Sequence, residues 1–351
     1  MSKEAWYINE SELDDYQIPV IQKKMSSSFV VKGCAGSGKT VLALWKAKEI
    51  ADSELGSFYV VVYTKALRQF INDGVKEIGL PDARVVHHHR WQNSLHRPKA
   101  DFVIIDEVQD FTKDELKELQ ESAGKAFILF GDSAQQIYKG LKTDLMTMEQ
   151  IAYHTGLPMD QLVLNHRLPK KIARIAEFIN TTGDSLESVC TKEGPNKPFL
   201  VKAKNLEAQL QFIKDTIDER GYTDVGILFP ENMDVKRADE FFKKKGILVE
   251  AKYDIHWPDD TKFNLNFHSE NPKLMTYHSS KGLQFEAVFI PDCTMDNLPG
   301  GNVNPLYVAL TRTYQDLFVL YTGALTILLN EVPRNLFEPV DLTEDSEEKP
   351  F

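Results

Sequence analysis

Residues 33–40 of the chain read Gly33-Cys34-Ala35-Gly36-Ser37-Gly38-Lys39-Thr40. This order fits the pattern G-x-x-x-x-G-K-[ST], in which glycines permit a tight turn and successive backbone N–H groups point inward at phosphate oxygens. An apolar run at 29–31 precedes the turn, and a helical pattern follows at 41–50. Strand, turn and helix in this order predict a phosphate-binding loop, because the N-terminal end of the helix also favours anions.

The residue types of the loop assign separate roles. We expect Lys39 to reach the β- and γ-phosphates of ATP and the Thr40 hydroxyl to ligate Mg²⁺. The alternative, a glycine-rich turn without nucleotide, is disfavoured by the strand and helix on either side. ATP and Mg²⁺ are therefore the expected cofactors, and the other loop residues expected to surround the nucleotide are Gly33, Ala35, Gly36, Ser37 and Gly38.

A second acidic element follows an apolar run at 102–105, which ends in Asp106 and Glu107. A strand of this kind places carboxylates at the carboxyl edge of the sheet, where open α/β sheets bind ligands. Asp106 is expected to hold Mg²⁺, and Glu107 to act as the general base toward the attacking water. An acid-rich helix N-terminus is the alternative interpretation. The phosphate loop makes the catalytic interpretation the stronger one.

The remaining pattern alternates short apolar β-branched runs with helical stretches such as 235–245, which predicts a parallel-sheet α/β fold. The halves are expected to meet near Leu164, giving domains at 1–164 and 165–333. The acidic, proline-containing segment 334–351 is predicted to be disordered. Candidate strands are 29–31, 59–63, 102–105, 127–130, 225–229, 247–249, 274–276, 288–290 and 317–321.

Composition sets looser bounds on function. The chain has 351 residues and a formal net charge of −11, which argues mildly against nucleic-acid binding but leaves room for a local basic groove. No run of eighteen apolar residues is present, so we expect no membrane contact. The three cysteines are far apart and odd in number, which favours a reducing, cytoplasmic location.

The segment Asp106-Glu107-Val108-Gln109-Asp110 resembles the D-E-x-Q-D motif of the UvrD/Rep class of superfamily 1 helicases. Further segments resemble motifs of that family in the same order along the chain: 13–17, 63–67, 130–138, 164–167, 224–232, 275–285 and 306–312. The resemblance implies an α/β protein of the P-loop NTPase type, built from two RecA-like parallel-sheet domains. It also implies an ATP hydrolase whose nucleotide lies between the two halves.

The resemblance also implies roles around the nucleotide. Gln135 corresponds to the glutamine that senses the γ-phosphate, and Arg167 and Arg312 correspond to arginines that reach it. Cations at those positions stabilise the charge that develops on the transferred phosphoryl group. Together with Glu107, these residues form the expected catalytic set.

The base-binding residues depart from the family pattern. Gln17 corresponds to the glutamine that reads the adenine edge. His166 stands where the family has a tyrosine that stacks on adenine, and Val41 stands where it often has the arginine on the other face. Gln284 replaces a glutamate that reaches the ribose, and it can still hydrogen-bond a hydroxyl group. We therefore expect looser discrimination between bases.

Expected nucleic-acid contacts are Tyr63 and Thr64, Tyr138, and Thr276 and His278. Tyr63, Tyr138 and His278 are candidates for stacking on bases, which carries much of sequence-independent strand binding. Each of these three rings is equally well explained as a packed residue at the end of a strand.

The chain is short for the family, since neither of the two large inserted subdomains fits between its motifs. One hypothesis is a nucleic-acid motor: an ATPase that translocates on single strands, with DNA favoured over RNA. The other is an ATP-gated regulatory subunit that switches a protein partner, such as a nuclease, in a repair or defence complex. We expect the machinery for unwinding duplexes to be minimal or to be supplied by a protein partner.

Overall fold

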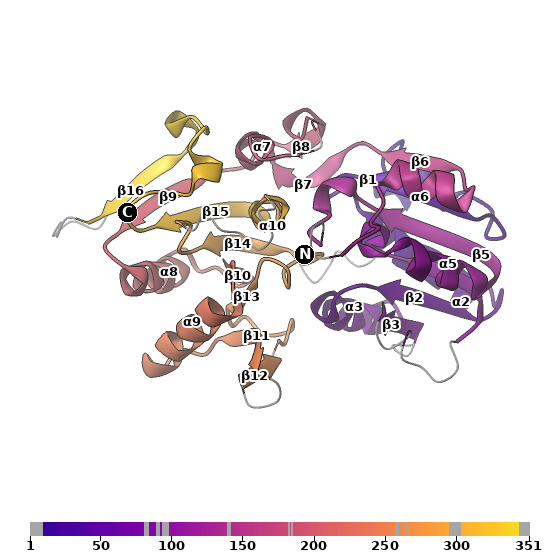
Figure 1. Cartoon of the computed structure of the whole chain (residues 1–351), viewed down its shortest axis with the longest axis horizontal. Coiled ribbons are helices and arrows are strands. Elements are labelled where there is room, and N and C mark those ends of the chain that lie inside the picture. Colours follow the sequence, from indigo (N-terminus) through magenta and orange to yellow (C-terminus); the bar gives the residue numbers. More distant parts are fainter. Residues whose placement is uncertain are drawn as a thin grey trace. The chain divides into compact units, whose positions relative to one another are not determined.

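Two compact units make up the chain, residues Met1–His166 and Arg167–Phe351. Figure 1 draws the first in indigo to magenta and the second in pink to yellow. This computed structural model describes residues 10–80, 84–88, 92, 98–138, 142–181, 183, 185–256, 260–263, 265–294 and 303–343. Each unit contains a largely parallel sheet, so the predicted α/β fold class is confirmed.

The first unit is built on a six-stranded sheet in the order β3-β2-β4-β5-β1-β6, in which every neighbouring pair is parallel. The strands are β1 (Phe29–Gly33), β2 (Phe58–Val62), β3 (Val85–His87), β4 (Ala100–Ile105), β5 (Ala123–Gly131) and β6 (Met159–Leu162). The helical segments are η1 (Glu10–Glu12), α1 (Gln17–Ile21), α2 (Lys39–Asp52), α3 (Lys65–Glu77), η3 (Val108–Asp110), α5 (Lys113–Glu121), η4 (Ser133–Gln135) and α6 (Met148–Thr155).

The central strands of this sheet are apolar on both faces because helices cover both faces of a parallel sheet. In β1, Val30 and Val31 are fully buried, and in β4 both Ile104 and Ile105 are fully buried. Hydrophobic burial of these runs fixes the positions at which β1 and β4 end. The loop after β1 and the acidic pair after β4 are thereby placed at the same carboxyl edge.

The second unit contains an eight-stranded sheet in the order β12-β11-β13-β10-β14-β15-β9-β16, parallel except for the β12–β11 pair, and a small β7-β8 sheet. The strands are β7 (Asn165–Pro169), β8 (Cys190–Lys192), β9 (Phe199–Ala203), β10 (Val225–Phe229), β11 (Glu250–His256), β12 (Asp260–Phe263), β13 (Lys273–Thr276), β14 (Phe285–Ile290), β15 (Thr313–Tyr321) and β16 (Glu338–Leu342). The helical segments are α7 (Lys170–Glu177), η5 (Glu187–Val189), α8 (Leu206–Arg220), α9 (Asn232–Lys244), α10 (Asn304–Leu310), η7 (Ile327–Leu329) and η8 (Arg334–Leu336). None of the described helices is long and apolar enough to cross a membrane.

The structure contradicts the predictions for two segments. The strand expected at 247–249 begins instead at Glu250, because residues 246–247 complete the end of α9: Gly246 has φ 72°, and the Ile247 N–H donates to the Phe242 carbonyl at 2.9 Å. The disorder predicted from residue 334 is also wrong for 338–342. That segment forms β16, which pairs in parallel with β9.

Strand β16 forms because its few apolar side chains are spaced to enter the core. Val340 is 6 % exposed and belongs to the main core cluster of the unit, and Phe337 just before the strand is 2 % exposed. The acidic composition of the segment concealed this short apolar pattern. The last part of the predicted tail, 344–351, lies outside the described residues.

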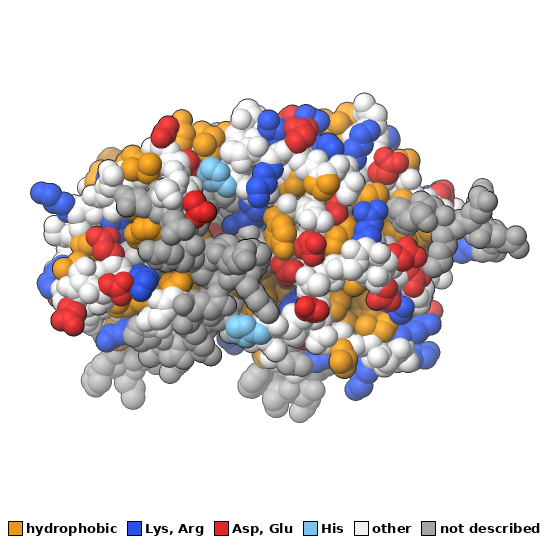
Figure 2. Space-filling model, turned by 180° about the vertical axis from the view of Figure 1, so that it is seen from behind, with side chains coloured by type: hydrophobic (Ala, Val, Ile, Leu, Met, Phe, Trp, Pro, Cys, Tyr) orange, Lys and Arg blue, Asp and Glu red, His pale blue; other side chains and the backbone are white. Residues whose placement is uncertain are grey.

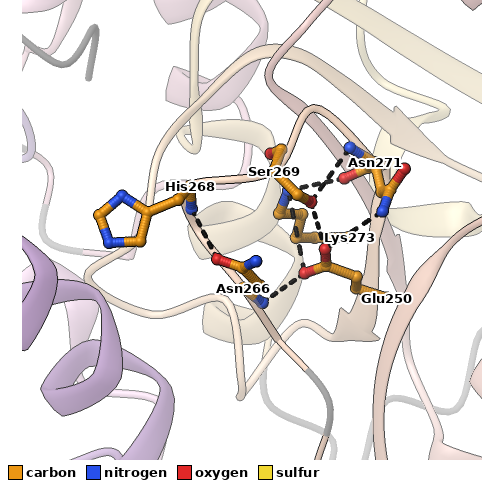
Figure 3. A network of polar contacts seen from close by, with 6 residues as sticks. All are labelled: Glu250, Asn266, His268, Ser269, Asn271 and Lys273. Carbon is orange, nitrogen blue, oxygen red and sulfur yellow. Dashed lines mark hydrogen bonds and ion pairs between the residues drawn. The ribbon is translucent and has the colours of Figure 1, made fainter.

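A buried ion pair closes the loop that leads into β13 (Figure 3). Glu250 Oε2 lies 3.9 Å from Lys273 Nζ, and both side chains are almost fully buried. Lys273 Nζ donates to the carbonyls of Ser269 and Asn271 at 2.6 and 2.7 Å, and Glu250 accepts from Ser269 Oγ and the Asn266 N–H. The network therefore holds the loop backbone against the N-terminal ends of β11 and β13.

We predict that Lys273→Met lowers the free energy of unfolding by about 3 kcal/mol or more, because it leaves Glu250 buried without its cation. Lys214→Met is the matched control, since Lys214 pairs with the exposed Asp218 one turn along α8. Its cost should be much smaller, because an exposed ion pair contributes little to stability. Urea unfolding followed by circular dichroism measures both, and equal costs would show that the buried network contributes nothing special.

Candidate nucleotide site

The loop between β1 and α2 depends on glycine at several positions. Gly36 and Gly38 adopt φ values of 78° and 85°, the left-handed region that glycine enters without a steric penalty. A Cβ at Gly33 would lie 2.4 Å from Ser37 Oγ, and one at Gly38 would lie 2.8 Å from Gln17 Nε2. The backbone is therefore wound tightly with side chains packed against it, as a phosphate-binding loop requires.

Two loop side chains present buried donors. Lys39 is 6 % exposed, and its Nζ donates to the carbonyls of Gly33 and Cys34 at 2.9 and 2.8 Å. Ser37 is 1 % exposed, and within the described part of the chain its Oγ has no hydrogen-bond partner. A buried ammonium that donates to neutral carbonyls, and a hydroxyl that has no partner among the described residues, fit the oxygens of a polyphosphate.

Thr40 and Asp106 meet at the carboxyl edge of the sheet. Thr40 Oγ1 donates to Asp106 Oδ2 at 2.7 Å, and Asp106 is 1 % exposed. Burial, followed by the charge of neighbouring Glu107, raises the pKa of Asp106 to about 6. A buried carboxylate beside a hydroxyl is an oxygen-donor set of the kind that Mg²⁺ prefers, so the residues fit the predicted cation.

Glu107 is held in an unusual conformation. Its φ of 59° and ψ of 42° lie in the left-handed region, which a non-glycine residue adopts only where its surroundings enforce it. Its N–H donates to Asp106 Oδ1 at 3.0 Å, and its Oε2 accepts from Gln109 Nε2 at 2.5 Å. Both ends of the residue are thus fixed, and the side chain remains 95 % buried beside the loop.

Gln135 lies at the same edge, after β5. It is 2 % exposed, and its Nε2 donates to Asp132 Oδ2 at 2.7 Å. The Asp132 N–H in turn donates to Gln109 Oε1 at 3.0 Å. Gln109 and Asp132 were not among the predicted site residues, although both lie within the motif-like segments that contain Glu107 and Gln135.

Three residues from outside the loop, Asp14, Gln17 and His166, form a hydrogen-bonded group that contacts it. Asp14 accepts from the Gln17 N–H through Oδ1 at 2.7 Å and from His166 Nε2 through Oδ2 at 2.5 Å. Gln17 Nε2 donates to the Ser37 carbonyl at 3.0 Å, and the His166 N–H donates to the Gly36 carbonyl at 3.2 Å. The structure therefore brings both predicted base-binding residues to the loop through Asp14. Asp14 was not among the predicted site residues, although it lies in the motif-like segment 13–17 that contains Gln17.

The remaining predicted nucleotide-site residues lie in the second unit. Arg312 is 2 % exposed, and its guanidinium donates to the carbonyls of Val308 and Leu283 at 2.8 and 3.4 Å and to Thr311 Oγ1 at 3.1 Å. Arg312 thus makes several of its contacts inside its own unit. Arg167, in β7, is half-buried.

Gln284 has a partly unsatisfied amide. The residue is 5 % exposed, and among the described residues its Oε1 has no hydrogen-bond partner. A buried amide oxygen of this kind is suited to accept a hydrogen bond from a ligand hydroxyl.

Of the predicted nucleic-acid contacts, Tyr63 is a core residue in this structure. It is 7 % exposed, its ring stacks on His88 at 5.7 Å between centroids, and it meets Phe111 edge-on at 5.3 Å. Lys142 Nζ lies 4.7 Å from the centre of the same ring. In this structure the Tyr63 ring is therefore packed against His88, Phe111 and Lys142, and its contact with a base stays a prediction. Half-buried Tyr138 packs 5.0 Å from Tyr63.

The other predicted contacts lie at ends of strands. Thr64 Oγ1 accepts from the Leu67 N–H at 3.1 Å at the start of α3, and Thr276 Oγ1 bonds to Ser279 Oγ at 3.1 Å just after β13. His278 follows Thr276 and is half-buried. On the face drawn in Figure 2, basic and acidic side chains are interspersed.

A parallel sheet, a glycine-rich phosphate loop and a buried acidic pair at one edge define a P-loop NTPase. Two family descriptions match the sequence: "Viral superfamily 1 RNA helicase core domain" over residues 29–223 and "UvrD-like helicase C-terminal domain" over 273–320. Because the first match covers more than half of the chain, the chain belongs to this superfamily 1 helicase family. The resemblance found in the sequence motifs is confirmed.

Individual proteins that resemble the chain share little sequence identity with it. A protein of Acanthamoeba polyphaga mimivirus named "Putative ATP-dependent DNA helicase" is 22 % identical over 379 residues, covering 88 % of this chain and 53 % of the relative. The chain thus spans about half the length of the curated relative it matches.

Solved structures with partial likeness include the C-terminal domain of a possible DNA helicase from Lactobacillus plantarum WCFS1, with 20 % identity and a TM-score of 0.39 over 50 % of this chain and 98 % of that one. Arterivirus nonstructural protein 10, a helicase, has 14 % identity and a TM-score of 0.44 over 92 % of this chain and 64 % of that one.

We predict that Asp14→Ala weakens ATP binding about tenfold, because one carboxylate orients both Gln17 and His166, and loss of a charged hydrogen bond of this kind is worth about 1.4 kcal/mol. Asp15→Ala, which removes the exposed neighbouring carboxylate, should leave the Kd unchanged. Isothermal titration calorimetry with ATP measures both. Equal Kd values for the two variants would refute the role of Asp14 in orienting Gln17 and His166.

Proposed function

We propose that the chain is an ATP-dependent nucleic-acid motor, an ATPase stimulated by single-stranded nucleic acid, with DNA favoured over RNA. The observation that carries this proposal is the meeting of Lys39, Thr40, Asp106 and Glu107 at one edge of the first sheet, in a chain of the superfamily 1 helicase family. These residue types at one buried edge are those that phosphoryl transfer to water requires.

The roles of the four residues follow from their chemistry. Lys39 exchanges its backbone carbonyl partners for phosphate oxygens, which are stronger acceptors because they are charged. Thr40 and Asp106 hold Mg²⁺, which supplies positive charge to the phosphates when it is bound. Glu107, already fixed at both ends, accepts the proton of the attacking water.

The second unit supplies the remaining proposed groups. Arg167 and Arg312 act as cations toward the γ-phosphate, and Gln284 accepts a hydrogen bond from the ribose. For Arg312 this requires that its bonds to the Val308 and Leu283 carbonyls be given up. A charged phosphate is a better partner for a guanidinium than two neutral carbonyls, so the exchange is favourable when nucleotide is bound.

Single-stranded nucleic acid is the proposed track, and Thr64, Tyr138, Thr276 and His278 are the proposed contacts. The preference for DNA draws on the printed name of the mimivirus relative, whereas the matching core family is named for RNA helicases. The three cysteines are far apart in the sequence and odd in number, which supports a reducing compartment such as the cytoplasm.

Substitutions at the loop and at the acidic pair should separate binding from hydrolysis. We predict that Glu107→Gln keeps ATP binding but lowers hydrolysis at least a hundredfold, because only the base is removed. Lys39→Ala should also raise the Kd for ATP, because a phosphate partner is lost. Calorimetry and phosphate release measure the two quantities, and unchanged turnover in Glu107→Gln would refute the assignment of the base.

Nucleic acid should control the rate. We predict that single-stranded DNA raises the ATPase rate about tenfold or more, which needs only about 1.4 kcal/mol of preference for the active state. The stimulation should fall as salt rises, because backbone contacts release counterions, and duplex should stimulate less. Steady-state phosphate release with DNA, RNA and duplex at several salt concentrations measures it.

The control for this measurement is Arg312→Ala, which should lose the stimulated rate and retain strand binding. Because Arg312 also bonds within its own unit, its melting temperature must be recorded beside the rate. If saturating single-stranded DNA and RNA both leave the wild-type rate unchanged, the translocase proposal fails. The ATP-gated regulatory subunit that switches a protein partner then takes its place.

A further inference from the structure

A buried chain of hydrogen bonds joins Glu107 to Gln135. Gln109 Nε2 donates to Glu107 Oε2 at 2.5 Å, the Asp132 N–H donates to Gln109 Oε1 at 3.0 Å, and Gln135 Nε2 donates to Asp132 Oδ2 at 2.7 Å. All four residues are at most 5 % exposed. Hydrogen bonds of buried polar groups are costly to leave unmade, so a change at one end is felt along the chain.

Gln109 lies in the middle of this chain of hydrogen bonds, and both the nitrogen and the oxygen of its side-chain amide are hydrogen-bonded. Its Nε2 faces the end of β4 and its Oε1 faces the end of β5, while its backbone carbonyl accepts from Gln136 Nε2 at 3.1 Å. Gly131 leaves room for this amide, since a Cβ there would lie 2.6 Å from Gln109 Oε1. Gln109 is fully buried, so it cannot change rotamer without breaking both contacts.

Both carboxylate oxygens of Asp132 also accept hydrogen bonds. Its Oδ1 accepts from the Ala134 N–H at 3.0 Å, which starts the helical turn η4, and its Oδ2 accepts from Gln135 Nε2. When the Gln135 amide turns toward another acceptor, it gives up this bond to Asp132. The Asp132 backbone and Gln109 are therefore the route by which such a movement reaches the other strand end.

We propose that Gln109 is a positioning residue that fixes the carboxylate of Glu107, and that Asp132 couples this carboxylate to Gln135. The proposal rests on the proposed ATPase function. The left-handed backbone of Glu107 is a conformation that its surroundings must hold, and Gln109 supplies the contact at its carboxylate. A contact between Gln135 and the nucleotide thereby adjusts the orientation of the base without touching it.

The test uses steady-state kinetics of Gln109→Leu in the full chain. The expected result is a kcat at least tenfold lower with a KM for ATP within twofold of wild type, because the loop residues that bind phosphates are untouched. Gln136→Leu is the matched control: Gln136 is a neighbouring buried glutamine, 6 % exposed, whose side-chain amide bonds to the Gln109 and Met146 carbonyls. Its kcat should stay within twofold of wild type.

A double-mutant cycle tests the coupling. Asp132→Asn keeps the backbone bond to Gln109 but replaces the acceptor for Gln135 with a donor. It should lower kcat about fivefold in the wild-type background and less than twofold in the Gln109→Leu background, because the route is already cut. Equal effects in both backgrounds would overturn the coupling.

The outcomes separate this proposal from the proposed function. If the wild-type chain hydrolyses ATP and Gln109→Leu matches Gln136→Leu in kcat, the positioning role is wrong while the ATPase stands. If Gln109→Leu raises the KM for ATP by the same factor by which it lowers kcat, and also lowers the melting temperature, the residue has only a structural role. The proposal is then overturned as well. A wild-type chain without ATPase activity, with or without single strands, overturns both.

Discussion

The parallel pairing of β4, β5 and β1 is the constraint on which the site depends. Because the three strands run in the same direction, the segments that follow them leave the sheet at one edge, although they are separated by many residues in the chain. Thr40, after β1, can therefore bond to Asp106, after β4, at 2.7 Å. A shift in register of one residue would turn Asp106 to the other face of the sheet and abolish this contact.

Because the charged groups at that edge are buried, the free energy of each one depends on the charges of its neighbours. Lys39, Asp106 and Glu107 are each at most 6 % exposed, and a buried charge without a partner costs several kcal/mol. Burial and the charge of Glu107 raise the pKa of Asp106, in the direction expected for such a cost. Nucleotide and cation would supply opposite charges to such groups, so binding relieves a penalty that the fold maintains. This is how a folded protein can hold a reactive arrangement before its ligand arrives.

Backbone contacts around the loop tie it to distant parts of the first unit. Lys46 of α2 is fully buried and donates to the carbonyls of Ile21 and Lys23, which fastens the end of α1 to α2. The other end of α1 carries Gln17, which bonds to the loop at Ser37. His166, the last residue of the unit, bonds to Gly36. The loop is therefore hydrogen-bonded to the last residue of the first unit.

The sequence by itself determined the phosphate loop, the acidic pair and the α/β class, because each depends on local residue order: glycines that permit positive φ, an apolar strand, and a helix that follows. It did not determine which side chains are free. Tyr63 was a candidate for base stacking, yet His88 and Phe111, which contact it, come from separate segments of the chain. Strand β16 was not predicted because its segment is acidic. Burial of Val340 stabilises this strand only when β9 lies beside it. Asp14, Gln109 and Asp132 acquire their roles only in the tertiary structure, because a hydrogen bond depends on distance in space, and strand pairing sets that distance between residues far apart in the chain.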